Sequence, residues 1–186
     1  MTKMSHRRTP ARQAVSTSLP ALLDGGSDRR LREVIQAIFG LASRMTALRE
    51  RIGAIVGLTG AQYSMLLSLG HLARDGEKVS VNTLAAHLHV SGTYVTAESK
   101  KLEKLRLLRR DPNPDDGRSV ILGLDDEGRI LLSEVLPFVR AINDILFADV
   151  TRKSFAVLHD ELPNLVESAD EALLIAAAEE RRRQRR

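Results

Sequence analysis

Apolar residues recur every three or four positions along most of this chain, a spacing that predicts amphipathic helices. Long stripes of this kind occupy residues 28–54, 125–150 and 151–176, and shorter ones follow Thr59 and Asn82. Thr59 and Gln62 have the spacing of a capping box, and Asn82 and Thr151 are residue types that cap helices. Prolines lie inside the two last stripes, where they are expected to bend or break a helix, at Pro137 and Pro163.

A further helix is predicted from Ser91 to Arg106. Ser91 can accept hydrogen bonds from the first amides, and Val95, Leu102 and Leu105 form a narrow apolar stripe. Hydroxyl and cationic side chains occupy the other face. Such groups contact DNA bases and phosphates, although the same pattern also suits a solvated helix. The candidate contacts on this helix are Ser91, Thr93, Tyr94, Thr96, Lys100 and Lys101.

Residues 108–124 have the pattern of a β-hairpin, with two short alternating segments joined by a turn rich in Asp, Pro and Gly. A brief strand at 79–81 is expected to pair with it. A helix that fits a major groove beside an arginine-bearing hairpin suits a DNA duplex. The candidate contacts of the hairpin are Arg109, Arg110, Asp116 and Arg118.

Several short motifs follow one another in this region in a characteristic order. They are Val90-Ser91, Val95-Thr96, Leu102-Glu103-Lys104, Leu107-Leu108, Arg110, Asp116 with Arg118, and Leu124 to Gly128. In order and nearly in spacing, they resemble the MarR (multiple antibiotic resistance regulator) family of winged-helix transcription factors. The resemblance covers about residues 30–176. Arg106 departs from it, because the family usually has Gly there, so a less sharply capped helix end is expected.

The resemblance implies a mainly α fold with a small β-hairpin wing, in which a winged helix-turn-helix is joined to long dimerisation helices. The expected parts are a flexible basic N-terminal arm (1–27), a helical dimerisation region (28–57 and 125–176), a DNA-binding lobe (58–124) and a charged C-terminal tail (177–186). The apolar surface of the long helices exceeds what one small lobe can bury, which also favours a twofold dimer.

The function implied is that of a homodimeric regulator, most often a repressor, that binds an inverted-repeat operator in double-stranded DNA. Members of the family are commonly released from DNA by a small anionic or aromatic effector, an aromatic acid or an acyl-thioester. The effector is held between the dimer helices and the DNA-binding lobe. The candidate ligand residues are Arg44, Met45, Tyr63 and His71, with Arg44 as the partner of a carboxylate.

The composition of the chain limits which chemistry, which mode of DNA binding and which compartment are expected. The chain has no cysteine, which excludes thiol chemistry and a thiol redox switch, and its formal net charge is +4. A modest charge of this size indicates salt-sensitive binding through a few placed contacts. No apolar run has the length of a membrane span and the N-terminus lacks a secretion signal, so a cytoplasmic protein is expected.

Neither catalysis nor cofactor binding is predicted. The sequence lacks a glycine-rich phosphate loop and a nucleophile elbow, and its histidines do not share a helical face as metal ligands would. The main alternative is a winged-helix module that binds another protein and takes no effector. Steep salt dependence of duplex binding would distinguish the DNA-binding hypothesis from this one.

Overall fold

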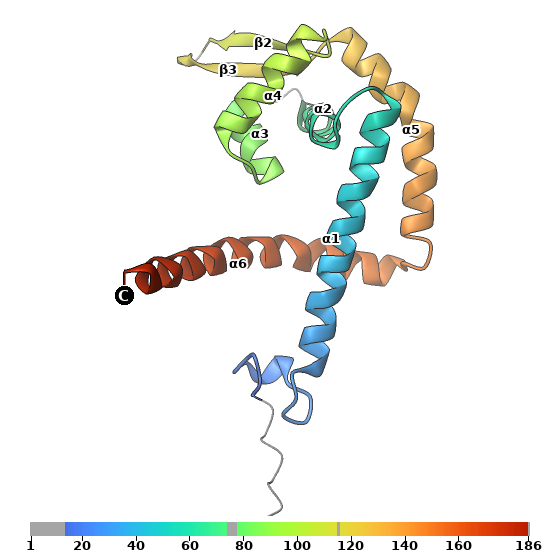
Figure 1. The fold of residues 1–186 in the computed structure, drawn as a ribbon. Helices are drawn as coiled ribbons and strands as arrows, with labels where there is room; N and C mark the ends of the chain where they lie inside the picture. Colours follow the sequence, from blue (N-terminus) through green and yellow to red (C-terminus); the bar gives the residue numbers. More distant parts are fainter. Residues whose placement is uncertain (1–13, 74–77, 115, 186) are drawn as a thin grey trace, which may run out of the picture. The chain divides into compact units, whose positions relative to one another are not determined.

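A computed structural model describes residues 14–73, 78–114 and 116–185, except for the side chain of Arg118. The chain divides into two compact units, the first ending at Val135 and the second beginning at Leu136. Figure 1 shows the order of the elements along the chain. They are η1 (Pro20–Leu22), α1 (Arg29–Ile55), α2 (Gly60–Leu72), β1 (Val79–Ser80), α3 (Val81–Leu88), α4 (Gly92–Lys104), β2 (Leu108–Asn113), β3 (Asp116–Leu124), α5 (Asp126–Leu146) and α6 (Arg152–Gln184).

The segment before α1 is fastened to the start of that helix. Asp28 is 1% exposed, and its Oδ2 accepts hydrogen bonds from the backbone N (2.7 Å) and Oγ (2.6 Å) of Ser16. These bonds hold the pKa of Asp28 below its usual value, and Arg32 lies 2.9 Å from its other oxygen. Residues 14–27 therefore have a defined local structure, unlike the flexible arm that was expected. Residues 1–13 lie outside the described part of the chain.

The first unit is organised around one apolar core beneath α2, α3, α4 and the sheet. Leu66, Leu69, Leu84 and Leu102 are each 0% exposed in this core. The strands are antiparallel in the order β1-β3-β2, and Val79 pairs with Leu122. The prediction of a mainly helical fold with a winged helix-turn-helix is confirmed, as is the pairing of a short strand with the wing.

Most of the predicted helix starts are confirmed. Thr59 and Gln62 form a capping box, Ser91 accepts from the backbone N of Tyr94, and Thr151 caps α6. The prediction for Asn82 is wrong, because Ser80 caps α3 by accepting from the backbone N of Thr83. The helix begins at Val81, two residues earlier than the apolar pattern indicates. Asn82 therefore lies within its first turn.

The expected loose end of α4 is also wrong. Arg106 has a φ of +57°, so it takes the left-handed conformation that glycine usually supplies. The backbone N of Leu107 donates to the carbonyl of Leu102 (3.0 Å), and that of Arg106 donates to Glu103 (2.9 Å). These two bonds make a complete Schellman cap despite the Cβ of the arginine.

Both prolines lie inside continuous helices. Pro137 is within α5 and Pro163 within α6, so the break considered at Pro163 does not occur. Helix α6 also continues to Gln184, through most of the predicted charged tail. There Glu179 pairs with Arg182 (2.7 Å) and Arg183 (2.8 Å), an arrangement that supports a last helical turn.

Replacing the residue that caps α4 is predicted to stabilise the protein. In Arg106→Gly, the left-handed backbone no longer carries the steric cost of a Cβ, and the gain is partly offset by the extra freedom of glycine in the unfolded chain. We expect the free energy of unfolding in urea to rise by about 0.5–1 kcal/mol. The matched control, Arg106→Ala, keeps the Cβ and should show no such gain. A glycine variant less stable than the alanine variant would contradict this account of the cap.

Candidate nucleic-acid interface

Helix α4 is divided into a buried face and an exposed face. Val95, Ser99 and Leu102 are each 0% exposed, whereas Thr93 and Lys100 are exposed. Burial of the first three residues in the core fixes the rotation of the helix about its own axis. The hydroxyl and ammonium groups of the other face are consequently held in solvent, next to the wing that β2 and β3 form in Figure 1.

One of the exposed lysines of α4 is paired with an acid on the same helix. The Nζ of Lys101 lies 2.6 Å from Oε1 of Glu98, while Nε2 of Gln62 on α2 donates to the other carboxylate oxygen (3.1 Å). The hydrogen bond from Lys101 is the largest cause of the lowered pKa of Glu98, and Glu98 in turn raises the pKa of Lys101. Both groups are therefore charged at neutral pH.

The wing is braced against α4 by Arg110. Its side chain is only 11% exposed, its Nη1 donates to Oγ of Ser99, and its Nε lies 3.8 Å from a carboxylate oxygen of Glu103. Arg109 on the same strand is 50% exposed, contacts Asp111 (3.0 Å) and donates to the carbonyl of Leu124 (2.8 Å). The two arginines thus differ, because one is largely internal and the other lies at the surface.

A polar groove of about 540 Å³ separates the start of α3, the middle of α4 and the wing. Its lining is rich in hydroxyl and amide side chains, and it includes Thr96, which is half-buried. The full lining is Ser80, Val81, Asn82, Thr96, Arg110, Asn113, Asp116, Ser119 and Val120. The groove therefore connects the outer face of α4 with the wing.

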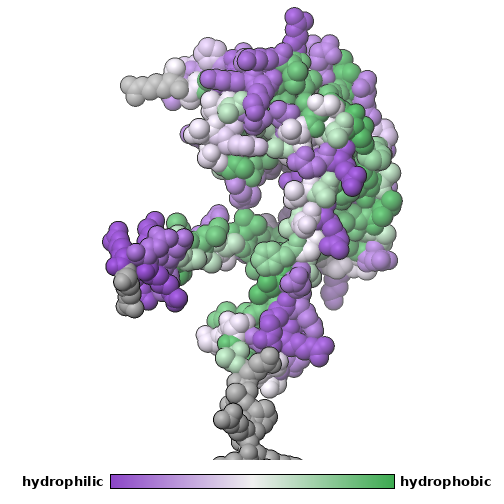
Figure 2. Space-filling view, viewed as in Figure 1, coloured by the Kyte–Doolittle hydropathy of each residue, from purple (hydrophilic) through white to green (hydrophobic). Residues whose placement is uncertain are grey.

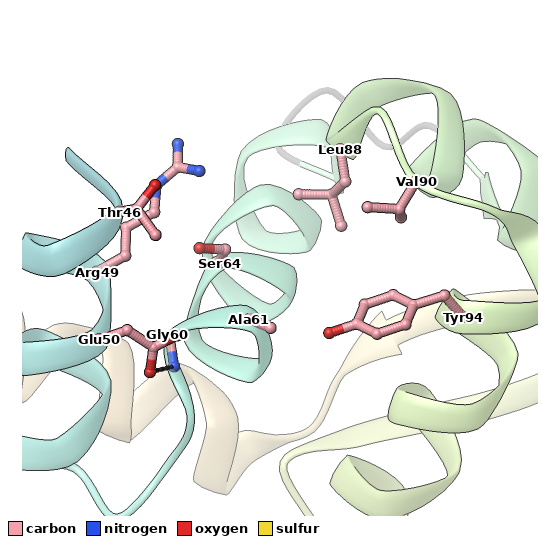
Figure 3. Close-up of a pocket in the computed structure, with 9 residues that line it drawn as sticks. All are labelled: Thr46, Arg49, Glu50, Gly60, Ala61, Ser64, Leu88, Val90 and Tyr94. Atoms are coloured by element: carbon pink, nitrogen blue, oxygen red, sulfur yellow. Dashed lines mark hydrogen bonds between the residues drawn. The ribbon is translucent and has the colours of Figure 1, made fainter. Parts of the chain in front are cut away.

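A second cavity, of about 220 Å³, lies between α1, α2 and the turn from α3 into α4. Figure 3 shows Arg49 and Thr46 on one side and the ring of Tyr94 on the other, with its hydroxyl directed toward α2. Glu50 accepts a hydrogen bond from the backbone N of Gly60 at 2.9 Å. The remaining lining residues are Ala61, Ser64, Leu88 and Val90. The cavity thus combines a cation, an anion, an aromatic ring and apolar side chains.

Sequence comparisons match the same region of the chain. The MarR family model matches residues 56–119, which contain α2, α3, α4 and most of the wing. This stretch of the chain is similar to the MarR family. An HTH-type regulator of Bacillus subtilis, YdcH, is 31% identical over 96 residues, covering 52% of this chain and 65% of the relative. The B. subtilis repressor MdtR is 35% identical over 86 residues, covering 46% and 53%. The matches thus span less than two thirds of either relative.

Solved structures show the same MarR fold over a longer stretch. AbsC from Streptomyces coelicolor, a MarR family transcriptional regulator, has a TM-score of 0.65 at 20% identity, covering 75% of this chain and 94% of AbsC. The Staphylococcus aureus MepR–DNA complex has a TM-score of 0.60 at 18% identity, covering 72% and 96%. At these identities the two structures show the fold of the chain.

The predicted DNA contacts fall into several structural settings. Thr93 and Lys100 are exposed and Lys101 is paired, whereas Ser91 caps α4 and Arg110 is mostly internal. Thr96 and Asp116 line the polar groove, while Tyr94 is 40% exposed and lines the smaller cavity. Arg109 is at the surface of the wing, and the side chain of Arg118 lies outside the described part. Their contacts with DNA stay a prediction.

The predicted ligand residues do not line the cavity between α1 and α2. Arg44 donates to the carbonyl of Gly40 one turn earlier (2.9 Å), and Met45 is 36% exposed on α1. Tyr63 is 2% exposed within the first unit, where burial raises its pKa. His71 is at the end of α2, its ring 6.4 Å from that of His87. Their role in ligand binding stays a prediction.

The histidine pair does not form a metal centre within the described residues, where no group of three or more potential ligands occurs. Burial, followed by the nearby His71 and His89, lowers the pKa of His87, which favours the neutral ring. Among the described segments, no single helix is both long and apolar enough to cross a membrane. Only α1 and α2 taken together, across a bend of 89°, pass that test of length and composition.

Sequence reasoning missed the residues that connect α4 with α2 and α1. Gln62 was identified only as a capping residue, but its amide also reaches Glu98 across 36 positions of sequence. Arg49 and Glu50 lie on the cavity side of α1, one turn beyond the residues that were selected. Gly60 was one indication in the sequence that α1 and α2 approach closely, because any Cβ there would lie 2.7 Å from atoms of Glu50. A glycine at the start of a helix indicates such a close approach.

Proposed function

We propose that this chain is a DNA-binding transcriptional regulator that places α4 in the major groove and the wing against the flanking backbone. One observation carries the proposal: burial of Val95 and Leu102 leaves Thr93, Lys100 and their neighbours in solvent beside the hairpin. A helix presenting hydroxyl and ammonium groups fits a major groove, where such groups contact base edges and phosphates. Arg109 on the wing supplies a further cation at the surface.

The solved relatives support this proposal. Among the proteins of the same fold are MepR in complex with DNA and the Escherichia coli MarR C80S mutant complexed with operator DNA. MdtR is a transcriptional repressor, which favours repression as the sign of regulation here as well. Repression would follow simply from occupation of an operator by the bound protein.

We further propose that the protein acts as a homodimer. Helix α1 exposes a row of large apolar side chains, including Ile38 at 46% and Phe39 at 66%. In the second unit, α6 exposes Leu162, Leu165 and Leu173 at 48%, 53% and 66%. Apolar side chains are conspicuous along α5 and α6 in Figure 2, and the C-terminal end of α6 is hydrophilic. Patches of this extent usually mark an interface, and a second copy with the same patches can cover them.

A twofold dimer would also explain how a small lobe gains specificity. Two copies of α4 spaced by about 34–36 Å would contact half-sites one turn apart on an inverted repeat. Each half-site alone offers few base contacts, because only about one turn of helix reaches the groove. Two linked half-sites multiply the discrimination.

Binding to duplex DNA should depend steeply on salt. If a dimer neutralises ~6–10 phosphates, its affinity should fall by ~10³–10⁵ between ~50 and ~200 mM salt. Fluorescence anisotropy with a labelled duplex that contains an inverted repeat, and with a shuffled duplex as control, measures this dependence. A chain that binds neither duplex at low salt, or binds them independently of salt, would contradict the proposed function and favour a protein partner for the wing.

The effector site of this regulator, in our proposal, is the cavity between α1, α2 and α4. The Arg49 side chain can pair with a carboxylate, while Leu88, Val90 and the ring of Tyr94 can pack against an aromatic ring. A volume of about 220 Å³ suits a single-ring aromatic acid better than an entire acyl-thioester, since sites for drug-sized ligands start at ~300 Å³. Tyr94 belongs to α4, so an occupant would press directly on the DNA-binding helix.

Benzoate, as a probe of the cavity, is expected to weaken duplex binding by the parent protein. A ligand that binds better to the DNA-free arrangement lowers DNA affinity by the ratio of its affinities for the two arrangements. Arg49→Gln removes the cation that would pair with the benzoate carboxylate and should abolish the response, while DNA affinity without benzoate stays within about twofold, because Arg49 is on α1 and not on α4. An equal response in both proteins, or none with a panel of single-ring acids, would contradict this effector site.

A further inference from the structure

We propose that Glu98 is a fixed counter-charge that limits how strongly Lys101 binds DNA phosphates, so that it reduces binding to non-specific duplexes. The inference rests on the proposed function and adds a residue that sets the strength of its sequence-independent DNA binding. Lys101 is on α4, and its Nζ contacts the Glu98 carboxylate at 2.6 Å. A phosphate that approaches Lys101 must compete with this carboxylate or accept its negative charge nearby.

The two partners differ in their freedom to move. Lys101 is 61% exposed, so its ammonium group can rotate toward solvent or toward a phosphate. Glu98 is 12% exposed, and its second oxygen accepts a hydrogen bond from Nε2 of Gln62 at 3.1 Å. DNA binding can therefore displace the lysine from the carboxylate, but it does not carry the carboxylate away.

Gln62 is itself held in place by the start of α2. Its Oε1 accepts from the backbone N of Thr59 (3.2 Å), and its own backbone N donates to Oγ1 of Thr59 (3.2 Å). The backbone N of Gly60, the residue after Thr59, donates to the carboxylate of Glu50 on α1 at 2.9 Å. This continuous set of bonds fixes Glu98 relative to the body of the lobe, so its charge stays beside the exposed face of α4 whether or not DNA is bound.

A counter-charge in this position affects one component of DNA binding in particular. Contacts between lysine and phosphate supply most of the affinity for any sequence and carry no sequence information. Lowering that component reduces binding to non-specific DNA by the same factor as binding to an operator, unless operator contacts draw Lys101 to a base edge. The ratio of operator binding to non-specific binding is then unchanged, and it is set by other groups of α4, such as the hydroxyls of Thr93 and Thr96.

The test uses the full chain, a mixed-sequence 30-base-pair duplex that has no inverted repeat, and anisotropy over a range of salt concentrations. Glu98→Gln removes the charge but keeps an oxygen that can accept from Gln62, so the fold is preserved. We expect this variant to bind about three- to tenfold more tightly at low salt. The slope of log affinity against log salt should steepen by about one for each α4 that contacts the duplex.

A double-mutant cycle shows whether the gain comes from Lys101. In the Lys101→Gln background, Glu98→Gln should change the affinity by less than about twofold, because the cation that it would release is absent. Lys101→Gln should likewise weaken binding more in the Glu98→Gln background than in the parent. Unfolding in urea, measured for all four proteins, checks that each is folded.

The results of these binding experiments distinguish failure of the counter-charge proposal from failure of the DNA-binding proposal. Parent binding that is salt-dependent, with no gain from Glu98→Gln, overturns the counter-charge and leaves the DNA-binding proposal standing. An equal gain in the presence and absence of Lys101 also overturns it, since any lost negative charge would then have the same effect. A parent protein that binds no duplex at low salt overturns both.

Discussion

The structure depends on a difference in where its apolar side chains are buried. Within the first unit, leucines and valines of α2, α3, α4 and the sheet are almost completely enclosed. Along most of α1 and α6 the large apolar side chains stay exposed. Enclosed side chains fix the lobe that carries α4, and exposed ones require a partner of similar character. The proposed DNA-binding surface and the proposed dimer both rest on this difference.

Polar side chains at the edge of the apolar core hold α4 against the wing and against α2. Ser99 is 0% exposed within the apolar face of α4, and it is satisfied by Arg110 from the wing. The Ser99 hydroxyl also donates to the carbonyl of Thr96 (3.2 Å), and its contact with Arg110 attaches the wing to the helix. On the opposite side, Gln62 and Glu98 attach α4 to α2. Polar contacts on two sides thus orient a helix whose rotation is already determined by burial.

Much of the fold could be predicted from the sequence, because helical periodicity and capping residues act locally. The capping box of Thr59 and Gln62, the N-cap Ser91 and the pairing of residues 79–80 with the wing all follow from such local signals. Two predictions of helix ends were wrong, and in each case a neighbouring group was the cause. Ser80 caps α3 in place of Asn82, and hydrogen bonds to Glu103 and Leu102 hold Arg106 and Leu107 in a cap that normally uses glycine.

The candidate site was harder to predict, because it depends on contacts between distant segments. The spacing of Thr93, Lys100 and Lys101 predicted an exposed polar face, but it could not show that Lys101 is paired or that Arg110 is mostly internal. The cavity brings α1, α2 and α4 together, and its residues share no sequence pattern. Periodicity gives the stripe that faces inward, whereas the packing angle of the helices decides which neighbouring residues line a cavity.

The claim that the exposed apolar faces pair two copies of the chain can be tested by the mass of the protein in solution. Sedimentation equilibrium at micromolar concentration, without DNA, is the direct measurement. The account predicts a single species of twice the chain mass of 20.5 kDa, unaffected by moderate salt because the contacts are apolar. A folded species of 20.5 kDa at the same concentration would contradict it.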